Sequence, residues 1–229
     1  MARRISTHAS HGSGHRGAPP DLSWERAYWR AGLPLVAGVD EVGRGAMAGP
    51  LVAAAVLLPA SEGWALRRLR AALDGVRDSK LLSPERRGEL YTAITQNASV
   101  AATGMVSVAE IDTFGLGPAN RIAMERAVYA LGIEVDALLI DACVLDLDCP
   151  QNGPIDADAF CLSVAAASIV AKVTRDRLMI ELGGEDPRYG FEQHKGYCSP
   201  LHKARLAEYG PGPHHRQCFS PVALWGAAP

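Results

Sequence analysis

Four acidic residues in this sequence could bring carboxylates together. Asp40 and Glu41 directly follow the apolar run LPLVAGV. Asp141 follows a second apolar run, ALLI, and Asp158 stands at the start of an expected long helix. Ligands of open α/β sheets gather outside the strand ends, so these side chains are expected to share one small volume. Such crowded carboxylates require cations, and oxygen ligands favour Mg²⁺ or Mn²⁺ in the two-ion arrangement used for phosphodiester cleavage.

Each acid also has an ordinary structural explanation. A single Asp at a strand end is usually a turn residue, and N-capping would explain Asp158 before a helix. Asp176, in VTRDRL, is most simply a solvated helix residue among arginines. An adjacent acidic pair after a run as apolar as LPLVAGV is harder to explain in this way. The hypothesis of a metal site therefore depends mainly on Asp40 and Glu41.

A glycine-rich segment follows the acidic pair and contains Gly43, Arg44 and Gly45. The residues GRGAMA match the dinucleotide-binding pattern G-x-G-x-x-[GA], but that pattern must open a helix. Here Pro50 and a strand-like run follow, and the two preceding carboxylates would repel a pyrophosphate. The glycines are therefore interpreted as backbone that comes close to a ligand, with exposed amides and with Arg44 available for a phosphate.

The elements that must position these residues alternate between strands and helices. Strands are expected in LPLVAGVDE, GPLVAAAVLLP, SVAATGMVSV and VDALLID, and helices at 62–73, 84–96, 117–131, 158–182 and 200–209. This order predicts a mixed α/β domain with helices covering the sheet. The small residues at 165–168 would let the longest helix lie close against that sheet.

Composition limits the class of protein. The chain has 229 residues, 48% of them hydrophobic, which suits one domain with a core of its own. The net charge is −2, so a nucleic-acid surface must be local, and basic residues are concentrated at 67–89 and 188–216. The uncharged stretch 45–61 is interrupted by Pro50 and Pro59 and is shorter than the about 20 apolar residues of a membrane span. No membrane segment is predicted.

Neither the cysteines nor the histidines predict a metal site. The five cysteines show no C-x-x-C spacing, which argues against structural zinc. An odd number of cysteines without a signal peptide indicates reduced thiols and a cytoplasmic protein. The C-terminal histidines are interpreted as structural, with a metal or general-acid role as the alternative. They are His194, His202, His214 and His215.

Five segments, in order along roughly residues 33–222, resemble the motifs of bacterial ribonuclease HII. They are GVDEVGRGAMAGPL, DSKLLSPERRGEL, LLIDAC, AAASIVAKVTRDRLM and HKGYCSPLHKARLAEYGPGPHHRQCF. The resemblance implies a ribonuclease H-like α/β fold, with a mixed central sheet flanked by helices and a small helical C-terminal extension. The expected boundaries are a disordered tail at 1–20, a catalytic domain at 21–184 and a substrate-contacting region at 185–229.

The resemblance also implies an activity. Members of this family cut the RNA strand of RNA–DNA hybrids and DNA duplexes at embedded ribonucleotides, by two-ion hydrolysis that leaves 5′-phosphate and 3′-hydroxyl ends. Mg²⁺ or Mn²⁺ is the implied cofactor, the hybrid or ribonucleotide-containing duplex is the implied partner, and we expect a monomer. Two alternative functions stay open. One is a ribonuclease H specialised for long hybrids, and the other is a nucleic-acid-binding module that has lost catalysis.

By motif position, the resemblance assigns roles to individual residues. The carboxylates of Asp40, Glu41, Asp141 and Asp158 would bind metal and catalyse. The loop Gly43-Arg44-Gly45 would recognise the ribose 2′-hydroxyl, and Tyr197 would stack on that sugar. Lys80 and Lys195 lie within matched motifs and would contact the substrate.

The sequence departs from the family pattern at four places. Ala46 replaces a common proline, Ala142 replaces the glycine after the third carboxylate, and Cys198-Ser199 replaces Pro-Thr after the tyrosine. Asp156-Ala157 stands where the family commonly has Lys-Gly, so Asp156 could take the place of Asp158. None of these changes removes a carboxylate.

Overall fold

The computed structural model describes residues 18–140, 143–220 and 222–223 of the chain. Most of the expected N-terminal tail, residues 1–17, and the expected carboxylate of Asp141 lie outside this part.

Strands and helices alternate along the described chain. The strands are β1 (Val36–Val42), β2 (Leu51–Leu57), β3 (Val100–Val106), β4 (Ala137–Ile140) and β5 (Gln151–Asn152). The α-helices are α1 (Ser23–Arg30), α2 (Gly63–Ala72), α3 (Pro84–Asn97), α4 (Val108–Phe114), α5 (Leu116–Tyr129), α6 (Leu162–Glu185), α7 (Phe191–His194) and α8 (Pro200–Tyr209). Two 3₁₀ turns complete the order, η1 (Ser79–Leu81) and η2 (Ala157–Ala159).

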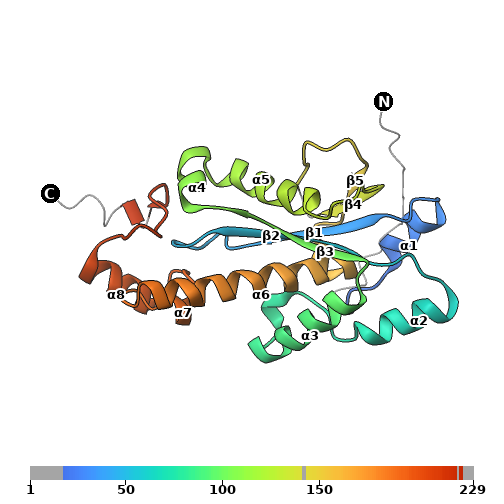
Figure 1. Cartoon of the computed structure of the whole chain (residues 1–229), viewed down its shortest axis with the longest axis horizontal. Coiled ribbons are helices and arrows are strands. Elements are labelled where there is room, and N and C mark those ends of the chain that lie inside the picture. Colours follow the sequence, from blue (N-terminus) through green and yellow to red (C-terminus); the bar gives the residue numbers. More distant parts are fainter. Residues whose placement is uncertain (1–17, 141–142, 221, 224–229) are drawn as a thin grey trace.

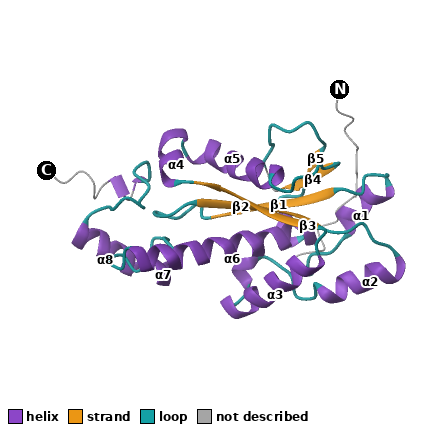
Figure 2. Ribbon diagram, viewed as in Figure 1, coloured by secondary structure: helices purple, strands orange, loops and turns teal. Residues whose placement is uncertain are grey.

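The strands form one mixed sheet in the order β3-β2-β1-β4-β5. β1 and β3 pair antiparallel with β2, whereas β4 pairs parallel with β1 and β5. Helices α4 and α5 lie on one face of the sheet, and α6 lies on the other with α2 and α3 outside it (Figure 1). The strands are thus a middle layer between two helical layers (Figure 2), and α7 and α8 continue beyond one end of the sheet. The expected α/β fold with a small helical extension is confirmed.

The alanine-rich strand β2 allows helices to approach both faces of the sheet. All its residues are buried, and successive side chains point to opposite faces. Ala54 and Val56 join the core under α6, while Ala53 and Ala55 join the core under α5. Small side chains on this interior strand therefore let the helical layers lie close to the sheet.

Helix α6 lies close against the backbone of the sheet at Gly38 of β1. A Cβ atom on Gly38 would lie 2.3 Å from the carbonyl carbon of Ser163 and 2.4 Å from the nitrogen of Val164. From Ser163 to Ser168 the helix advances by five residues, or about 7.5 Å. From Gly38 to Asp40 the strand advances by two residues, or about 6.6 Å. The contact at Gly38 therefore places Ser168 of α6 next to Asp40 of β1.

Helix α1, which the sequence pattern did not predict, fastens the N-terminus of α6. Glu25 of α1 is fully buried, and its Oε1 accepts a hydrogen bond of 2.8 Å from the backbone N–H of Ser163. This bond satisfies one of the free amides of the first turn of α6. Burial raises the pKa of Glu25 to about 7.

Two boundaries differ from the expectation. β1 does not end on the acidic pair but runs on to Val42, because its ladder with β2 continues through Asp40 and Glu41. The long helix was expected at 158–182, yet α6 begins at Leu162 and continues through two glycines to Glu185. A Cβ on the first of these, Gly183, would lie 2.9 Å from the backbone nitrogen of Glu192, so the missing side chain lets α7 pack there.

Replacing Glu25 by Gln isolates the effect of this buried acid on stability. The pKa of Glu25 is higher in the folded chain, about 7, than in the unfolded chain, about 4.5. Folded protein therefore binds more protons between these values, and stability is lost as pH rises from 4.5 through 7. Glu25→Gln should match the wild type at pH 4.5 and exceed it by about 3 kcal/mol above pH 8. Urea unfolding at both pH values measures the difference, and a pH-independent difference would contradict it.

Candidate active site

A cleft of about 910 Å³ lies over the end of β1. Its walls come from η1, η2, the first turns of α5 and the segment at residues 18–20. Five of the expected site residues line it together. They are Asp40, Glu41, Arg44, Lys80 and Asp158. Side chains separated by more than a hundred positions in the sequence are therefore neighbours in the fold.

The carboxylate of Asp40 lies in an unfavourable electrostatic environment. Burial and the negative charges of Glu41 and Asp158 together raise its pKa to about 8, against a hydrogen bond from Ser168 that lowers it. The Ser168 hydroxyl is itself 2.9 Å from the hydroxyl of Ser79 on η1. Positive charge is therefore needed beside Asp40 for it to ionise at neutral pH.

Lys80 supplies part of that positive charge. Burial alone would lower the pKa of Lys80, but four nearby carboxylates outweigh burial and raise it. In order of decreasing effect, they belong to Asp78, Asp158, Asp40 and Glu41. Lys80 is thus held as a cation at the wall of the carboxylate cleft.

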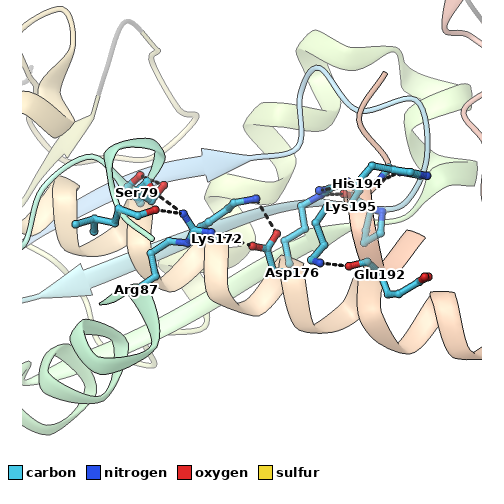
Figure 3. Close-up of polar contacts among 12 residues, drawn as sticks. Ser79, Arg87, Lys172, Asp176, Glu192, His194 and Lys195 are labelled. Atoms are coloured by element: carbon cyan, nitrogen blue, oxygen red, sulfur yellow. Dashed lines mark hydrogen bonds and ion pairs between the residues drawn. The ribbon is translucent and has the colours of Figure 1, made fainter. Parts of the chain in front are cut away.

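A polar network positions the turn that carries Lys80. The guanidinium of Arg87 on α3 donates a 2.9 Å hydrogen bond to the carbonyl oxygen of Ser79. Arg87 also lies 3.7 Å from a carboxylate oxygen of Asp176, which binds Lys172 one turn earlier on α6 at 2.7 Å (Figure 3). Asp176 is therefore a half-buried ion-pair residue and not a solvated one, and it ties η1 to α6.

Asp158 reaches the cleft from η2. The N-capping explanation for this residue is wrong, because the cap position of α6 is Cys161. The turn is fastened by the N-terminal segment, since Asp21 pairs with Cys161 in a parallel bridge. Asp156 also lines the cleft, in a left-handed conformation with φ of 59°, but it is exposed whereas Asp158 is half-buried.

Two buried arginines hold the glycine-rich segment in place. Arg216 donates hydrogen bonds of 2.9–3.2 Å to the carbonyl oxygens of Arg44, Gly49 and Pro50. Arg175 of α6 donates hydrogen bonds of 2.9–3.0 Å to the carbonyl oxygens of Ala48, Pro50 and Lys195. Burial lowers the pKa of both guanidinium groups, that of Arg216 to about 10. A guanidinium is charged at neutral pH in proteins. The carbonyl groups thus solvate two charges that have no carboxylate partner among the described residues.

Gly43 and Gly45 serve different purposes. Gly43 has a φ of +96°, and a Cβ there would lie 2.3 Å from Nε of Arg175. Its lack of a side chain is therefore required by the packing of the protein. Gly45 is exposed, and a Cβ there would meet no described atom within 4 Å. The fold does not demand glycine at position 45, so the bare backbone there is free to meet a ligand.

Tyr197 and Lys195 lie in the C-terminal region, outside the set of residues that line the cleft. The ring of Tyr197 lies beside two cations of α6, with its centroid 5.4 Å from Nζ of Lys172 and 5.2 Å from Cζ of Arg175. Lys172 is one turn from Ser168, about 6 Å along the helix. The ammonium of Lys195 donates to the backbone carbonyl of Glu192 (Figure 3), so here it fastens α7 and does not point to the cleft.

Three of the C-terminal histidines have structural hydrogen bonds. His215 accepts at Nδ1 from the N–H of Gly212, so its Nε2 donates to Nε2 of His202 at 3.0 Å. Nδ1 of His202 then donates to the carbonyl of Tyr197. Burial lowers the pKa of His202 and of His215 to about 4, which keeps both neutral at pH 7. Both ring nitrogens of His194 form hydrogen bonds with backbone groups, Nε2 with the carbonyl of Tyr189 and Nδ1 with the N–H of Gly196.

The cleft has the donor chemistry of a divalent-cation site. Asp40, Glu41 and Asp158 offer oxygen atoms, which suit hard cations. Their mutual repulsion, seen in the raised pKa of Asp40, is relieved when a cation binds between them. In the part of the chain that the structure describes, no three His, Cys, Asp or Glu side chains form a ligand group by themselves. The further expected ligand, Asp141, follows β4 directly and lies outside that part.

Sequence reasoning missed Arg175, Arg216 and Asn120. Arg175 is a charged residue on the buried face of α6, four positions from buried Ala171 and Met179. Asn120 likewise interrupts the buried face of α5 and lines the cleft. A polar residue at a core position of a helix was the available signal in both cases. Arg216, in an irregular segment, had no such signal.

Comparisons with known proteins agree with this geometry. The sequence matches the family model for ribonuclease HII over residues 37–222. Ribonuclease HII of Roseiflexus castenholzii is 47% identical over 211 residues, covering 90% of this chain and 91% of that protein. Ribonuclease HII of Chloroflexus aurantiacus is 48% identical over 204 residues, covering 89% of this chain and 94% of that protein.

Solved structures share the fold. Ribonuclease H2 from Pyrococcus horikoshii matches with a TM-score of 0.67 at 29% identity, covering 83% of this chain and 96% of that chain. Bst ribonuclease HIII, solved in complex with Mn²⁺, matches with a TM-score of 0.66 at 20% identity, covering 84% of this chain and 69% of that chain. The second likeness is one of fold alone.

The mixed sheet and its carboxylate cleft define a nuclease of the ribonuclease H-like class, which depends on divalent cations. Given the match over most of its length, the chain belongs to the ribonuclease HII family. It is a type 2 ribonuclease H, an endonuclease that hydrolyses the RNA strand of RNA–DNA hybrids. Within the described residues, the helices are all too short or too polar to cross a bilayer.

Alanine substitutions at the two glycines should separate packing from ligand contact. Gly43→Ala should lower the free energy of unfolding by about 2 kcal/mol or more, because the new methyl group collides with Arg175 at an unfavourable φ. Gly45→Ala should change stability by less than about 0.5 kcal/mol and still reduce cleavage at least about tenfold. Chemical denaturation and initial cleavage rates measure the two effects. Full activity of Gly45→Ala would contradict the ligand contact.

Proposed function

We propose that this protein cuts duplex DNA at embedded ribonucleotides, single ones included, as well as RNA–DNA hybrids, and leaves 5′-phosphate and 3′-hydroxyl ends. The observation that carries the proposal is the cleft that joins three carboxylates and Lys80 next to the open backbone of Gly45. We further propose that the chain acts as a cytoplasmic monomer.

The residues of the cleft suit two-ion hydrolysis. Asp40, Glu41, Asp141 and Asp158 would hold two divalent cations, Mg²⁺ or Mn²⁺. Bound cations of this kind supply the activation of the attacking water and the stabilisation of the departing ribose oxygen. Asp158 is preferred to Asp156 as the fourth carboxylate, because its charge acts directly on Asp40. Lys80 would balance the negative charge of substrate and carboxylates at the cleft wall.

Recognition of RNA requires contact with the 2′-hydroxyl, the group that DNA lacks. The exposed backbone at Gly45 can approach a sugar without a side chain in the way, and Arg44 at the cleft can bind a phosphate. Arg44 lies 3.3 Å from Glu41 and is largely exposed, so a phosphate can compete for its guanidinium. Tyr197 would supply an aromatic face for the sugar, and Lys195 a weaker phosphate contact nearby.

The decisive experiment compares three duplexes in Mg²⁺ with the product ends identified. One duplex carries a single ribonucleotide, one carries four in a row, and one is a full hybrid. Cleavage of the single-ribonucleotide duplex supports the proposal. Cleavage of the longer RNA stretches alone would identify a long-hybrid ribonuclease H, and binding without cleavage in any metal would identify a binding module.

Asparagine substitutions should show which carboxylates act. Asp40→Asn should lower cleavage by about 10³-fold or more, because it removes a negative metal ligand from the centre of the cleft. Asp158→Asn should lower it by about 10- to 100-fold, whereas Asp156→Asn serves as the matched control and should change it less than about threefold. Initial rates and Mn²⁺ titrations measure both effects. A larger loss from Asp156→Asn would reverse the assignment.

Tyr197→Ala should weaken cleavage at an isolated ribonucleotide more than it weakens duplex binding. The ring would stack on a single sugar, while binding depends on many phosphate contacts. We expect a loss of about tenfold or more in rate and less than about threefold in affinity. Tyr197→Phe separates the ring from the hydroxyl, and exposed Tyr129→Ala is the control. Equal losses in the two assays would argue against a role in reading the sugar.

A further inference from the structure

Helix α2 presents one exposed row that combines an aromatic ring with cations. Its inner face packs on the core through Leu66 and Leu69. Trp64, Arg67 and Arg70 follow one another at intervals of three residues, so their side chains line up along the helix. All three are exposed, and Trp64 is 67% exposed. The row therefore faces away from the protein and is open to another molecule.

The arginines of α2 carry charge that the protein does not neutralise. Within the described part of the chain, Arg67, Arg68 and Arg70 form no ion pair. Elsewhere a helix arginine pairs with an acid three positions later, as Arg86 does with Glu89 at 2.7 Å. An anion that approaches α2 can therefore pair with these arginines without displacing a carboxylate of the protein.

Trp64 holds one of these arginines in place. Cζ of Arg68 lies 5.7 Å from the centroid of the Trp64 ring. Such a cation–π contact restricts the guanidinium before a ligand arrives, which lowers the entropy lost on binding. Tryptophan and arginine are also residue types that are enriched where proteins bind partners. The composition of the row is thus typical of a binding surface.

The row leads to the carboxylate cleft. Arg70 lines a second hollow, of about 270 Å³, and Pro19 and Pro20 line both this hollow and the cleft. Arg77, five residues beyond the end of α2, is exposed and lines the cleft itself. The segment 62–77 contains four arginines and two acids, so its net charge is +2. Positive charge thus continues from the cleft onto the outer surface of α2.

We infer that α2 binds the phosphate backbone of the substrate duplex beyond the base pairs that occupy the cleft. This inference rests on the proposed function, because it takes the cleft as the site of cleavage. A duplex is a rod of negative charge, and exposed cations that adjoin the cleft attract it without regard to sequence. Helix α2 is about 15 Å long, which corresponds to about four base pairs. The contact with the duplex is therefore lengthened on one side of the cleavage site.

The test varies the length of the duplex on either side of the cleavage site. One RNA–DNA hybrid only fills the cleft, and two others are extended by about six base pairs, each on a different side. Binding is measured with the Asp40→Asn protein as the parent, so that the hybrid stays intact. Arg67→Gln combined with Arg70→Gln removes two cations, whereas Arg67→Lys combined with Arg70→Lys keeps them.

Arg177→Gln is the matched control for the arginine substitutions. Arg177 is exposed, and its Cζ lies 4.7 Å from the centroid of the Tyr91 ring, so it resembles Arg68 beside Trp64. Arg177 lines a hollow beside β3 whose described lining residues all differ from those of the cleft. Its loss therefore changes net charge without changing the surface that adjoins the cleft.

One extension should raise the affinity of the parent, and the double glutamine variant should lose that rise. Each phosphate contact contributes about 0.9 to the slope of log K against log salt, so the parent's advantage should shrink about tenfold between about 50 and about 200 mM salt. The double lysine variant should stay within about threefold of the parent, and Arg177→Gln should match it. Affinity for the short hybrid, the Tm and, with Asp40 restored, kcat on the short hybrid should not change.

Four results would overturn the inference. They are equal affinity of the parent for all three hybrids, a rise with length that survives in the double glutamine variant, a loss that the short hybrid or Arg177→Gln shares, and a lysine variant as weak as the glutamine variant. If the protein with Asp40 restored cuts no hybrid, or if Asp40→Asn cuts at the normal rate, the proposed function itself fails. If cleavage depends on Asp40 and any of the four results is found, the inference alone fails.

Discussion

The close approach of α6 to β1 is the constraint on which the rest of the site depends. It requires Gly38 on the strand and small residues on both the helix and β2. A larger side chain at the contact would push α6 outward and separate Ser168 from Asp40. The same approach buries Asp40 beside two further carboxylates, which costs stability. The fold thus uses close packing to hold together charges that repel each other, a conflict typical of functional sites.

The buried arginines make the C-terminal extension part of the site. Arg216 comes from that extension and Arg175 from α6, yet both bind carbonyl groups of the glycine-rich segment. A guanidinium suits this task because its planar donors reach several oxygens at once, which a lysine ammonium on a flexible stem does less well. Removing either arginine would leave buried carbonyls unpaired, so the loop, α6 and the extension are expected to unfold as one unit.

Local patterns in the sequence predicted much of this structure, and long-range contacts account for the remainder. The cap at Ser83 and the apolar runs located α3 and the strands, because these signals act over a few residues. Helix α1 was missed, because its buried Glu25 makes sense only beside Ser163. The register of β2 similarly decides where β1 ends. Five motif residues meet in the cleft as expected, but no local signal shows that Lys195 turns away from it.

The glycine-rich segment shows how neighbouring residues can differ in what the fold demands of them. Gly43 is enclosed by Arg175, whereas Gly45, two residues later, is exposed and has open space where a Cβ would lie. The carbonyl group of Arg44, directly before Gly45, accepts a hydrogen bond from Arg216, and that of Ala48 accepts one from Arg175. The backbone around Gly45 is therefore held in position by the protein itself. A segment that is already ordered loses little conformational entropy when a ligand binds to it, so the two buried arginines contribute to binding without touching the ligand.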